Sequence, residues 1–335
     1  MHVFRVFHGP IELAGQMGRL VGGLRQFGHQ AIGFNTFQSY LGYRNNIINT
    51  DWYDMIRQFD ALKDQFDIFH FHFNGTLFED ARDLKELHAL GKKFVMHHWG
   101  NDVRFKAKAA QLSPYLYDLC NPFTDEEIAA RLARNSQYIK TAIIQDLELL
   151  PYVLGHYTYV YVLPLAFDVT GTIPQYPRVD TRVPLIIHAP TQPTFKGTVY
   201  VEDAIQRLRQ AGFQFDYKRI EFMSNAEALS YYRQADIVID QLLVGTYGLF
   251  AVEAMALGKP VISYLREDLV STYPANLPII NANPTTLYNT LIPLITDPLL
   301  RHTTGIKSRQ YAEQRHDIPM IIPQLLEIYK VVMST

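Results

Sequence analysis

Residues 245–261, GTYGLFAVEAMALGKPV, decide the fold. A β-forming run, ADIVID (235–240), precedes them, and a second, PVISY (260–264), overlaps their end. Strand, glycine-bounded turn, helix and strand in this order predict a βαβ unit with parallel strands. The first amides of such a helix have no intrahelical partners and lie at the positive end of the helix dipole, so they suit a phosphate or diphosphate.

One acid stands about a turn into this predicted helix. Glu253 can accept hydrogen bonds from two vicinal hydroxyls, such as those of a ribose, and Gly248 lets a ligand approach the backbone closely. The alternative is a purely structural βαβ unit in which the glycines shape the turn and Glu253 is an exposed helix former. An NAD enzyme is disfavoured, because the nearest match to the dinucleotide fingerprint, Gly15-Gln-Met-Gly18, is incomplete.

The same alternation of strands and helices extends over the whole chain and predicts two doubly wound α/β domains. We expect one domain at 1–165, a proline-rich linker at 166–183, a second domain at 184–315 and a final helix at 316–335. The strands are predicted at 2–8, 30–34, 67–72, 93–97, 141–145, 184–189, 216–223, 235–240 and 260–264. The main helices are predicted at 15–27, 51–66, 79–90, 124–135, 201–211, 225–234 and from Leu249 to Gly258. Ligands then bind at the carboxyl ends of the strands, in a cleft between the domains.

Composition narrows the function classes. The chain has 335 residues, of which 48% are hydrophobic and 19% charged, and its formal net charge is −2. These values describe a globular protein without the basic field that nucleic-acid binding requires. The single cysteine, Cys120, excludes an intramolecular disulfide and a zinc site built from several thiolates. No apolar run has the length of a signal peptide core or a membrane span, so we expect a soluble, cytoplasmic protein.

Several segments together resemble one family, the retaining, family 4 type glycosyltransferases of GT-B fold (glycosyl transferases group 1). The donor motif of that family is similar to Tyr247-Gly248-Leu249, Val252-Glu253-Ala254-Met255-Ala256 and Gly258-Lys259-Pro260-Val261. Further similar segments are DIFHFH (67–72), VMHHWGNDVR (95–104), FKG (195–197) and QRHDIPMIIPQLLEIYKVV (314–332). The resemblance covers nearly the whole chain in order.

The resemblance implies a GT-B architecture. Two Rossmann-like domains would face each other across the active-site cleft, and the C-terminal helix would cross back to the N-terminal, acceptor-side domain. The second domain would bind the nucleotide-sugar donor through Lys196, Glu253, Gly248, Leu249, Phe250, Tyr247, Thr191 and Met223. The sugar and acceptor side would include Gly15, Gln16, Gly245 and His72, and the catalytic residues would be His98, His97 and Asp102.

The histidines allow more than one interpretation. His98 is the preferred counterpart of the family histidine, while one of His97 and His98 is expected to be a hydrogen-bonded core residue. Asp102 either fixes a loop turn or orients a histidine. His70 and His72 share a strand face, but no carboxylate stands at ligand spacing, so core packing or acceptor binding is preferred and no metal site is expected.

The family pattern is broken at two positions. The first glutamate of its donor motif falls on Gly245, and the arginine that clamps the diphosphate falls on Thr191. Arg104, Lys106 and Lys108 are read as a solvated helix face rather than a surface for an anionic acceptor or a membrane.

Taken with the resemblance, these residues predict a metal-independent, retaining hexosyltransferase of polysaccharide biosynthesis. The donor would be a nucleotide-diphosphate sugar, with a UDP-sugar favoured over a GDP-sugar, and the acceptor a hydroxyl of a saccharide or glycolipid. No cofactor and no nucleic-acid partner are expected, peripheral contact with the inner face of a membrane is an option, and the sequence specifies no oligomeric state. The rival hypotheses are a non-catalytic GT-B-like partner protein and a sugar-nucleotide epimerase of the same fold.

Overall fold

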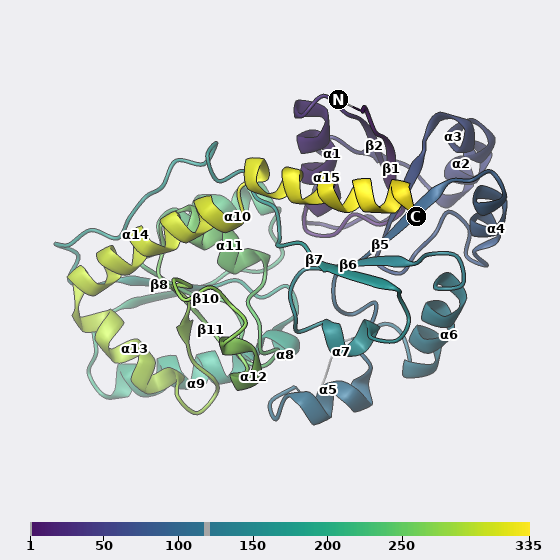
Figure 1. Cartoon of the computed structure of the whole chain (residues 1–335). Helices are drawn as coiled ribbons and strands as arrows, with labels where there is room; N and C mark the ends of the chain where they lie inside the picture. Colours follow the sequence, from purple (N-terminus) through teal and green to yellow (C-terminus); the bar gives the residue numbers. More distant parts are fainter. Residues whose placement is uncertain (1, 117–120) are drawn as a thin grey trace. The chain divides into compact units, whose positions relative to one another are not determined.

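The computed structural model describes residues 2–116 and 121–335, and Cys120 lies outside them. The chain divides into two compact units (Figure 1). The first unit comprises Met1–Lys108, Asn121–Ala166 and Ile318–Thr335, and the second comprises Ala109–Cys120 and Phe167–Asp317. The predicted domain limits did not anticipate that the second unit takes a short piece from the first half of the chain.

The first unit contains a seven-stranded sheet in the order β3-β2-β1-β4-β5-β6-β7, and every neighbouring pair is parallel. Its strands are β1 (Arg5–Gly9), β2 (Gln30–Asn35), β3 (Ile48–Asn49), β4 (Ile68–His72), β5 (Lys93–His98), β6 (Thr141–Ile144) and β7 (Tyr159–Val162). Its helices are α1 (Gln16–Gln26), α2 (Trp52–Arg57), α3 (Phe59–Gln65), α4 (Arg82–Ala89), α6 (Asp125–Asn135), α7 (Leu150–Val153) and α15 (Ile318–Ser334). Helix α5 (Lys106–Leu112) contains the limit between the two units.

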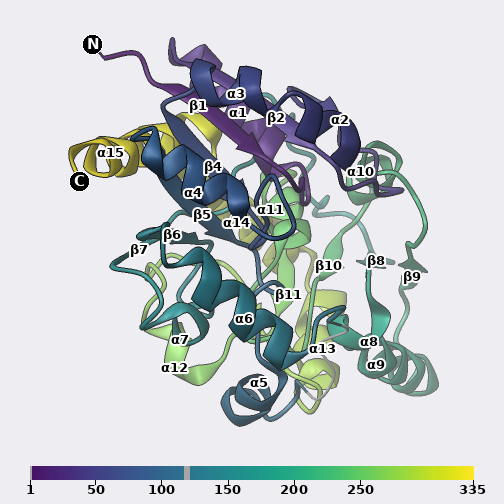
Figure 2. The same cartoon turned by 90° about the vertical axis from the view of Figure 1, so that its right-hand side faces the viewer.

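The second unit contains a five-stranded parallel sheet in the order β12-β11-β10-β8-β9. Its strands are β8 (Leu185–His188), β9 (Asp216–Arg219), β10 (Ile237–Ile239), β11 (Val261–Ser263) and β12 (Ile280–Asn281). Its helices are α8 (Pro193–Lys196), α9 (Thr198–Gln210), α10 (Asn225–Tyr232), α11 (Leu249–Ala256), α12 (Glu267–Val270), α13 (Leu287–Thr296) and α14 (Pro298–Arg315). Helix α11 lies beside β10 and β11 (Figure 2). The prediction of two Rossmann-like α/β domains is therefore confirmed.

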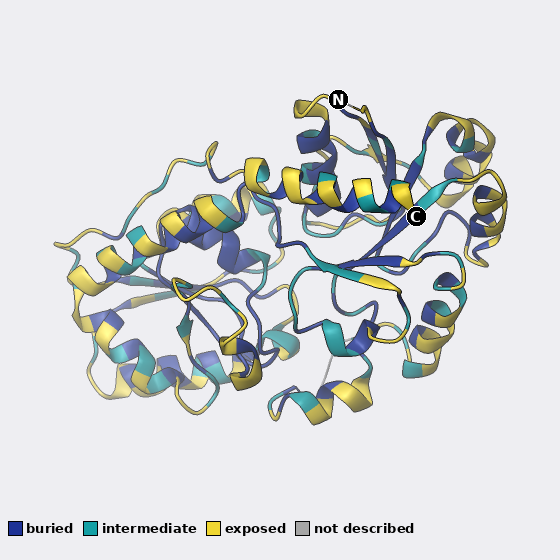
Figure 3. Cartoon of the chain, viewed as in Figure 1, coloured by how far each residue is buried: buried dark blue, intermediate teal, exposed yellow. Residues whose placement is uncertain are grey.

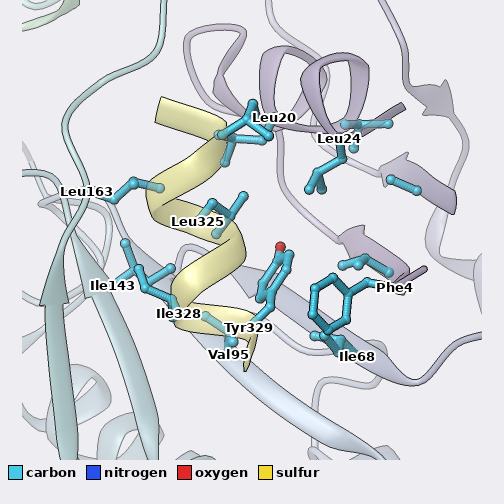
Figure 4. Close-up of a cluster of buried hydrophobic side chains, with 14 of the residues drawn as sticks. Phe4, Leu20, Leu24, Ile68, Val95, Ile143, Leu163, Leu325, Ile328 and Tyr329 are labelled. Carbon is cyan, nitrogen blue, oxygen red and sulfur yellow. The ribbon is translucent and has the colours of Figure 1, made fainter. Parts of the chain in front are cut away.

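The last helix, α15, completes the core of the first unit. Its buried side chains recur every three or four residues: Ile321, Ile322, Leu325, Ile328, Tyr329 and Val332. They pack with side chains of α1 and of strands β1, β4, β5 and β6 (Figure 4), while the opposite face of the helix is exposed (Figure 3). Burying each large aliphatic side chain contributes about 1.5–3 kcal/mol. The expected return of the C-terminal helix to the N-terminal domain is thus confirmed.

Some local predictions were too simple. The helix predicted at 51–66 is two helices, because the Gln58 amide shares its hydrogen bond between the carbonyls of Asp54 and Met55 and the chain turns there. The final helix was predicted to begin at residue 316. The structure has α14 ending at Arg315 and α15 beginning at Ile318, so the final helix starts two residues later. The two-residue strands β3 and β12 were not predicted. By contrast, the capping box of α6 between Thr124 and Glu127 is present as expected.

The predicted linker, 166–183, contains no helix or strand. From Phe167 onward it belongs to the second unit, where its backbone is fixed by hydrogen bonds. The Gln175 amide donates to the Leu257 carbonyl at 2.9 Å, and the Pro177 carbonyl bonds His302 Nδ1 at 2.8 Å. Among residues 2–116 and 121–335, none of the helices combines the length and the apolar character that a membrane span requires.

The role of α15 is testable by truncating one buried side chain. Leu325→Ala is expected to lower the free energy of unfolding by about 2–5 kcal/mol, because Leu325 is fully buried and the substitution leaves a cavity. The control is Met320→Ala on the same helix, where the side chain is 47% exposed and a change within about 0.5 kcal/mol is expected. Urea unfolding measures both. Equal effects would show that α15 is not part of the core.

Candidate functional site

The N-terminus of α11 carries a carboxylate. Asp240 follows β10, and its Oδ2 accepts a hydrogen bond of 2.7 Å from the backbone amide of Gly248, the N-cap residue of α11. Its Oδ1 accepts one of 2.8 Å from Lys196 Nζ, and the Asp240 side chain is fully buried. A negative charge is stabilised at a helix N-terminus, so Asp240 occupies the place that the sequence assigned to a phosphate.

Lys196 is held over this helix terminus. Its Nζ donates to Asp240 and, at 2.6 Å, to Gln241 Oε1, and its side chain is 12% exposed. An ammonium has three N–H donors, so one remains for a ligand oxygen. A Cβ at Gly248 would lie 3.3 Å from Lys196 Nζ and 3.4 Å from Asp240 Oδ2. Glycine at 248 thus lets ammonium, carboxylate and helix terminus come together.

Glu253 lies within α11 and is buried, with only 2% of its surface exposed. Its Oε1 accepts a hydrogen bond of 2.9 Å from Asn225 Nδ2, at the start of α10. The alternative in which Glu253 is an exposed helix former is therefore wrong. The half-buried Met223 directly precedes Ser224, which caps α10, and the neighbouring Phe222 is 86% exposed with a left-handed φ of 56°.

Two aromatic residues of the predicted donor site belong to the core of the second unit. Tyr247 is buried, and its hydroxyl bonds His316 Nε2 at 3.1 Å. Phe250 is buried against the Tyr232 ring, with centroids 4.5 Å apart. These side chains pack within the protein, so a role for either residue in donor binding falls to its backbone.

Two further predicted donor residues lie nearer the surface. Leu249 is half-buried as the first residue of α11, where its amide belongs to the helix N-terminus. Thr191, at the position of the family arginine, is exposed in the loop after β8. No basic side chain stands at that position of the sequence, so Lys196 supplies the cation here.

The backbone explains the glycine at position 245. Gly245 has a left-handed φ of 94°, and a Cβ there would lie 2.9 Å from Arg266 Cβ. The Gly245 carbonyl also accepts the Arg266 amide at 2.9 Å. A glutamate at this position would therefore meet both a strained backbone and a steric clash, which accounts for the departure from the family motif.

In the first unit, His97 and His98 point to opposite faces of the sheet, since successive strand residues alternate. His98 Nδ1 bonds Asp102 Oδ2 at 2.6 Å, and its Nε2 bonds the Tyr157 hydroxyl at 2.8 Å. Asp102 Oδ1 also accepts the amides of Trp99 and Gly100. Asp102 therefore both orients a histidine and fixes the loop. Both ring nitrogens of His98 have protein partners, and its side chain is fully buried.

The other face carries a row of buried histidines. His8, His70, His72 and His97 continue the faces that Val6, Ile68 and Val95 begin in β1, β4 and β5. Burial lowers the pKa of all four rings, that of His72 to about 3, so they are neutral at pH 7. His8 was not predicted, because its pairing with His70 depends on the order of the strands.

Ring nitrogens of His8, His70 and His72 lie within 4.8 Å of one another, a spacing that a metal ion could bridge. The rings of His70 and His72, however, are stacked, with their centroids 4.7 Å apart and their planes at an angle of 4°. Lone pairs lie in the ring planes, so those of stacked rings do not converge on one ion. His72 instead bonds His8, with Nε2 and Nδ1 3.0 Å apart, and the absence of a metal site stays a prediction.

The glycine-rich segment after β1 is folded around two polar side chains. Gln16 is buried and bonds the backbone of Ala166 twice, donating to its carbonyl at 3.1 Å and accepting its amide at 2.8 Å. Gly15, with φ of 74°, forms the N-cap of α1. Glu12 accepts the Gly18 amide at 2.8 Å, and burial raises the pKa of its carboxyl to about 7. Glu12 was not predicted, because one acid in a loop gives no signal.

The interpretation of Arg104 as part of a solvated helix face was wrong. Arg104 is 4% exposed and forms an ion pair of 2.6 Å with Glu148, which is also buried. A buried guanidinium requires such a partner, so Arg104 is a structural residue of the first unit.

Several solved structures are similar to this chain in fold. Sucrose-phosphate synthase from Thermosynechococcus elongatus is 13% identical, with a TM-score of 0.63 over 99% of this chain and 99% of the other. HepE from Anabaena, solved with UDP and glucose, is 13% identical with a TM-score of 0.66 over 98% and 100%. WaaG, a glycosyltransferase of lipopolysaccharide biosynthesis, is 12% identical with a TM-score of 0.59 over 97% and 99%.

The chain has the GT-B fold. No protein-family model matches the chain, and no curated protein sequence does. The GT-B assignment therefore depends on the two parallel sheets and their helices rather than on sequence identity.

The clash at position 245 is testable against a matched glycine. Gly245→Ala is expected to lower the free energy of unfolding by about 2–4 kcal/mol, through backbone strain and the contact with Arg266. Gly212 has a similar φ of 86° with no atom within 4 Å of an added Cβ, so Gly212→Ala should cost only about 1 kcal/mol. Equal losses in urea unfolding would show that Arg266 moves aside.

The buried histidines should make the fold acid-sensitive. Below pH 6.5 the unfolded chain protonates its histidines, while His8, His70, His72, His97 and His188 stay neutral in the folded state. Each of these histidines therefore lowers the free energy of unfolding by about 1.4 kcal/mol for each unit by which the pH falls. Burial raises the pKa of Glu12 to about 7 and of Asp83 to about 6, which acts in the opposite direction. Near pH 5 we expect a net uptake of protons on unfolding, because the buried histidines outnumber these two carboxyls.

Urea unfolding between pH 7 and pH 5 measures this slope. His188→Gln should reduce the uptake by about one proton, because the His188 ring is buried with its pKa lowered to about 4. A flat profile in the unsubstituted protein would mean that the histidine row is hydrated.

Proposed function

We propose that the protein is a glycosyltransferase that uses a nucleotide-diphosphate sugar. The observation that carries the proposal is the position of Lys196, which Asp240 holds beside the N-terminus of α11 at the carboxyl edge of the five-stranded sheet. The same helix carries the buried Glu253. Ligands of doubly wound folds bind at this edge. The GT-B neighbours support the class, and the HepE crystals contain UDP or UDP-glucose.

Each side chain has a chemical role in this proposal. The remaining N–H of Lys196 and the amides of Leu249 and Phe250 would bind the diphosphate and stabilise its charge as it leaves, while the Gly248 amide donates to Asp240. Glu253, oriented by Asn225, would accept the ribose hydroxyls. Asp240 would hold the ammonium in place, and its own charge would weaken binding of the resting diphosphate.

In the proposed reaction the bond from the anomeric carbon to the diphosphate oxygen breaks and a bond to the acceptor oxygen forms. The acceptor proton passes to the leaving diphosphate, so no protein nucleophile is required. We further propose retention of configuration and independence from metal ions, with a UDP-sugar as donor and a GDP-sugar as the next choice. His97, His98 and Asp102 are proposed for the sugar side of the reaction, together with Gly15, Gln16, Gly245 and His72.

We propose a hydroxyl of a saccharide or glycolipid as the acceptor. A glycolipid would bring the enzyme to the inner face of a membrane, and a saccharide would leave it in the cytoplasm. The second candidate is a non-catalytic GT-B-like protein. One observation favours it, namely that the Asp240 carboxylate already occupies the α11 terminus. A sugar-nucleotide epimerase would consume the donor without any acceptor.

Thermal unfolding with UDP, GDP, ADP and dTDP tests the donor site, because a ligand of the folded state raises the melting temperature. We expect a selective shift with UDP that Lys196→Ala and Glu253→Gln abolish. The controls are Lys307→Ala and Glu267→Gln, both at exposed positions of the second unit. UDP-glucose turnover with and without saccharide acceptors then separates transferase from epimerase. No shift with any nucleotide at millimolar concentration would favour the non-catalytic candidate.

A further inference from the structure

A chain of hydrogen bonds runs through the histidine row of the first unit. Trp99 Nε1 donates to His72 Nδ1 at 3.3 Å, and His72 Nε2 bonds His8 Nδ1 at 3.0 Å. His8 Nε2 bonds the Tyr329 hydroxyl at 3.2 Å, which bonds His70 Nδ1 at 2.7 Å. His70 Nε2 bonds His97 Nδ1 at 3.2 Å. These hydrogen bonds thus join the loop after β5 to strands β1, β4 and β5 and to α15.

The indole N–H of Trp99 decides which atom donates in each hydrogen bond of this chain. An indole N–H can only donate, so His72 Nδ1 must accept. A neutral imidazole has one donor and one acceptor, so His72 donates from Nε2 and His8 accepts at Nδ1. The same step repeats along the chain.

His8 therefore donates from Nε2 to Tyr329, whose single proton goes to His70 Nδ1. His70 then donates from Nε2 to His97 Nδ1. The assignment holds for neutral rings, and complete burial keeps all four neutral by lowering their pKa values.

The hydrogen-bond chain ends at His97 Nε2, which has no partner among the residues that the structure describes. If Nδ1 of His97 accepts, its Nε2 carries the proton, and this buried atom has no hydrogen-bond partner within residues 2–116 and 121–335. His97 is 1% exposed and its ring stacks on Trp99 at 3.9 Å. A buried donor without a partner is costly, and such atoms are found where a ligand supplies the acceptor. His97 also stands at the carboxyl edge of the sheet, where ligands of this fold class bind.

We propose that the Trp99–His72–His8–Tyr329–His70 chain fixes His97 as a permanent Nε2–H donor. His97 then gives a hydrogen bond to an oxygen of a bound molecule, a hydroxyl or phosphoryl oxygen, and does not act as a base. Trp99 and Tyr329 are positioning residues, since they set the tautomer of a ring at the other end of the chain. The proposal holds whether or not the protein is a glycosyltransferase.

The reverse direction shows why Trp99 decides the outcome. Reversal would place the proton of His72 on Nδ1, where it would face the indole N–H of the half-buried Trp99, so that two donors would lack an acceptor in place of one. We expect the forward direction to be favoured roughly tenfold or more. Without the indole N–H, each direction leaves one unsatisfied donor, so the two should coexist.

Nitrogen-15 NMR of histidine-labelled protein tests the proposal, because protonated and unprotonated ring nitrogens have well separated shifts. In the ligand-free protein at pH 7, His8, His70, His72 and His97 should all carry their proton on Nε2. His97→Gln identifies the His97 signals. A His97 ring with its proton on Nδ1, or a mixture of both forms, would overturn the proposal.

Two variants test the coupling at a distance. Trp99→Phe removes the donor at the start of the chain, and Tyr329→Phe removes the hydroxyl in its middle. Each should convert His97 from one tautomer to a mixture. The controls are Trp52→Phe and Tyr53→Phe, whose side chains are 41% and 70% exposed and lie outside the chain. If His97 keeps a single Nε2–H form in every variant that folds, the chain does not set its tautomer.

Discussion

The carboxylate of Asp240 holds together the parts on which the second unit depends. It receives the amide of Gly248 and the ammonium of Lys196, so it joins the end of β10 to α8 and to the start of α11. Parallel strands place their carboxyl ends at one edge of a sheet, which is why residues more than forty positions apart meet there. The same carboxylate holds the Lys196 ammonium in place and accepts the amide at the N-terminus of α11.

Strand periodicity imposes the corresponding constraint on the first unit. One face of the sheet is aliphatic near the middle of the strands and histidine-rich toward their carboxyl ends, as Val6 and His8 or Val95 and His97 show. Helix α15 covers this face with aliphatic side chains and with the Tyr329 hydroxyl. A polar network can therefore persist in a buried core, since each ring nitrogen of the histidine row except His97 Nε2 has a hydrogen-bond partner.

Sequence alone predicted what local patterns encode. The βαβ unit at 235–264 and the helix cap at Thr124 follow from residue order within a few turns. The contacts of His8, His72 and Tyr329 could not be predicted, because they depend on strand order and on a helix whose Tyr329 follows His8 by 321 residues. The link between Asp240 and Lys196 was missed for the same reason. The strands β3 and β12 are too short to show any period.

The place of α15 in the first unit also affects how the protein is made. Ribosomes release the chain from its N-terminus, and domains generally fold as they emerge. Strands β1 to β7 are complete by Val162, yet the helix that covers one face of their sheet begins only at Ile318. Residues Phe167–Asp317 of the second unit are synthesised in between. Until then the nascent sheet exposes Val6, Ile68, Val95 and the histidine row, a surface that a chaperone would be expected to shield.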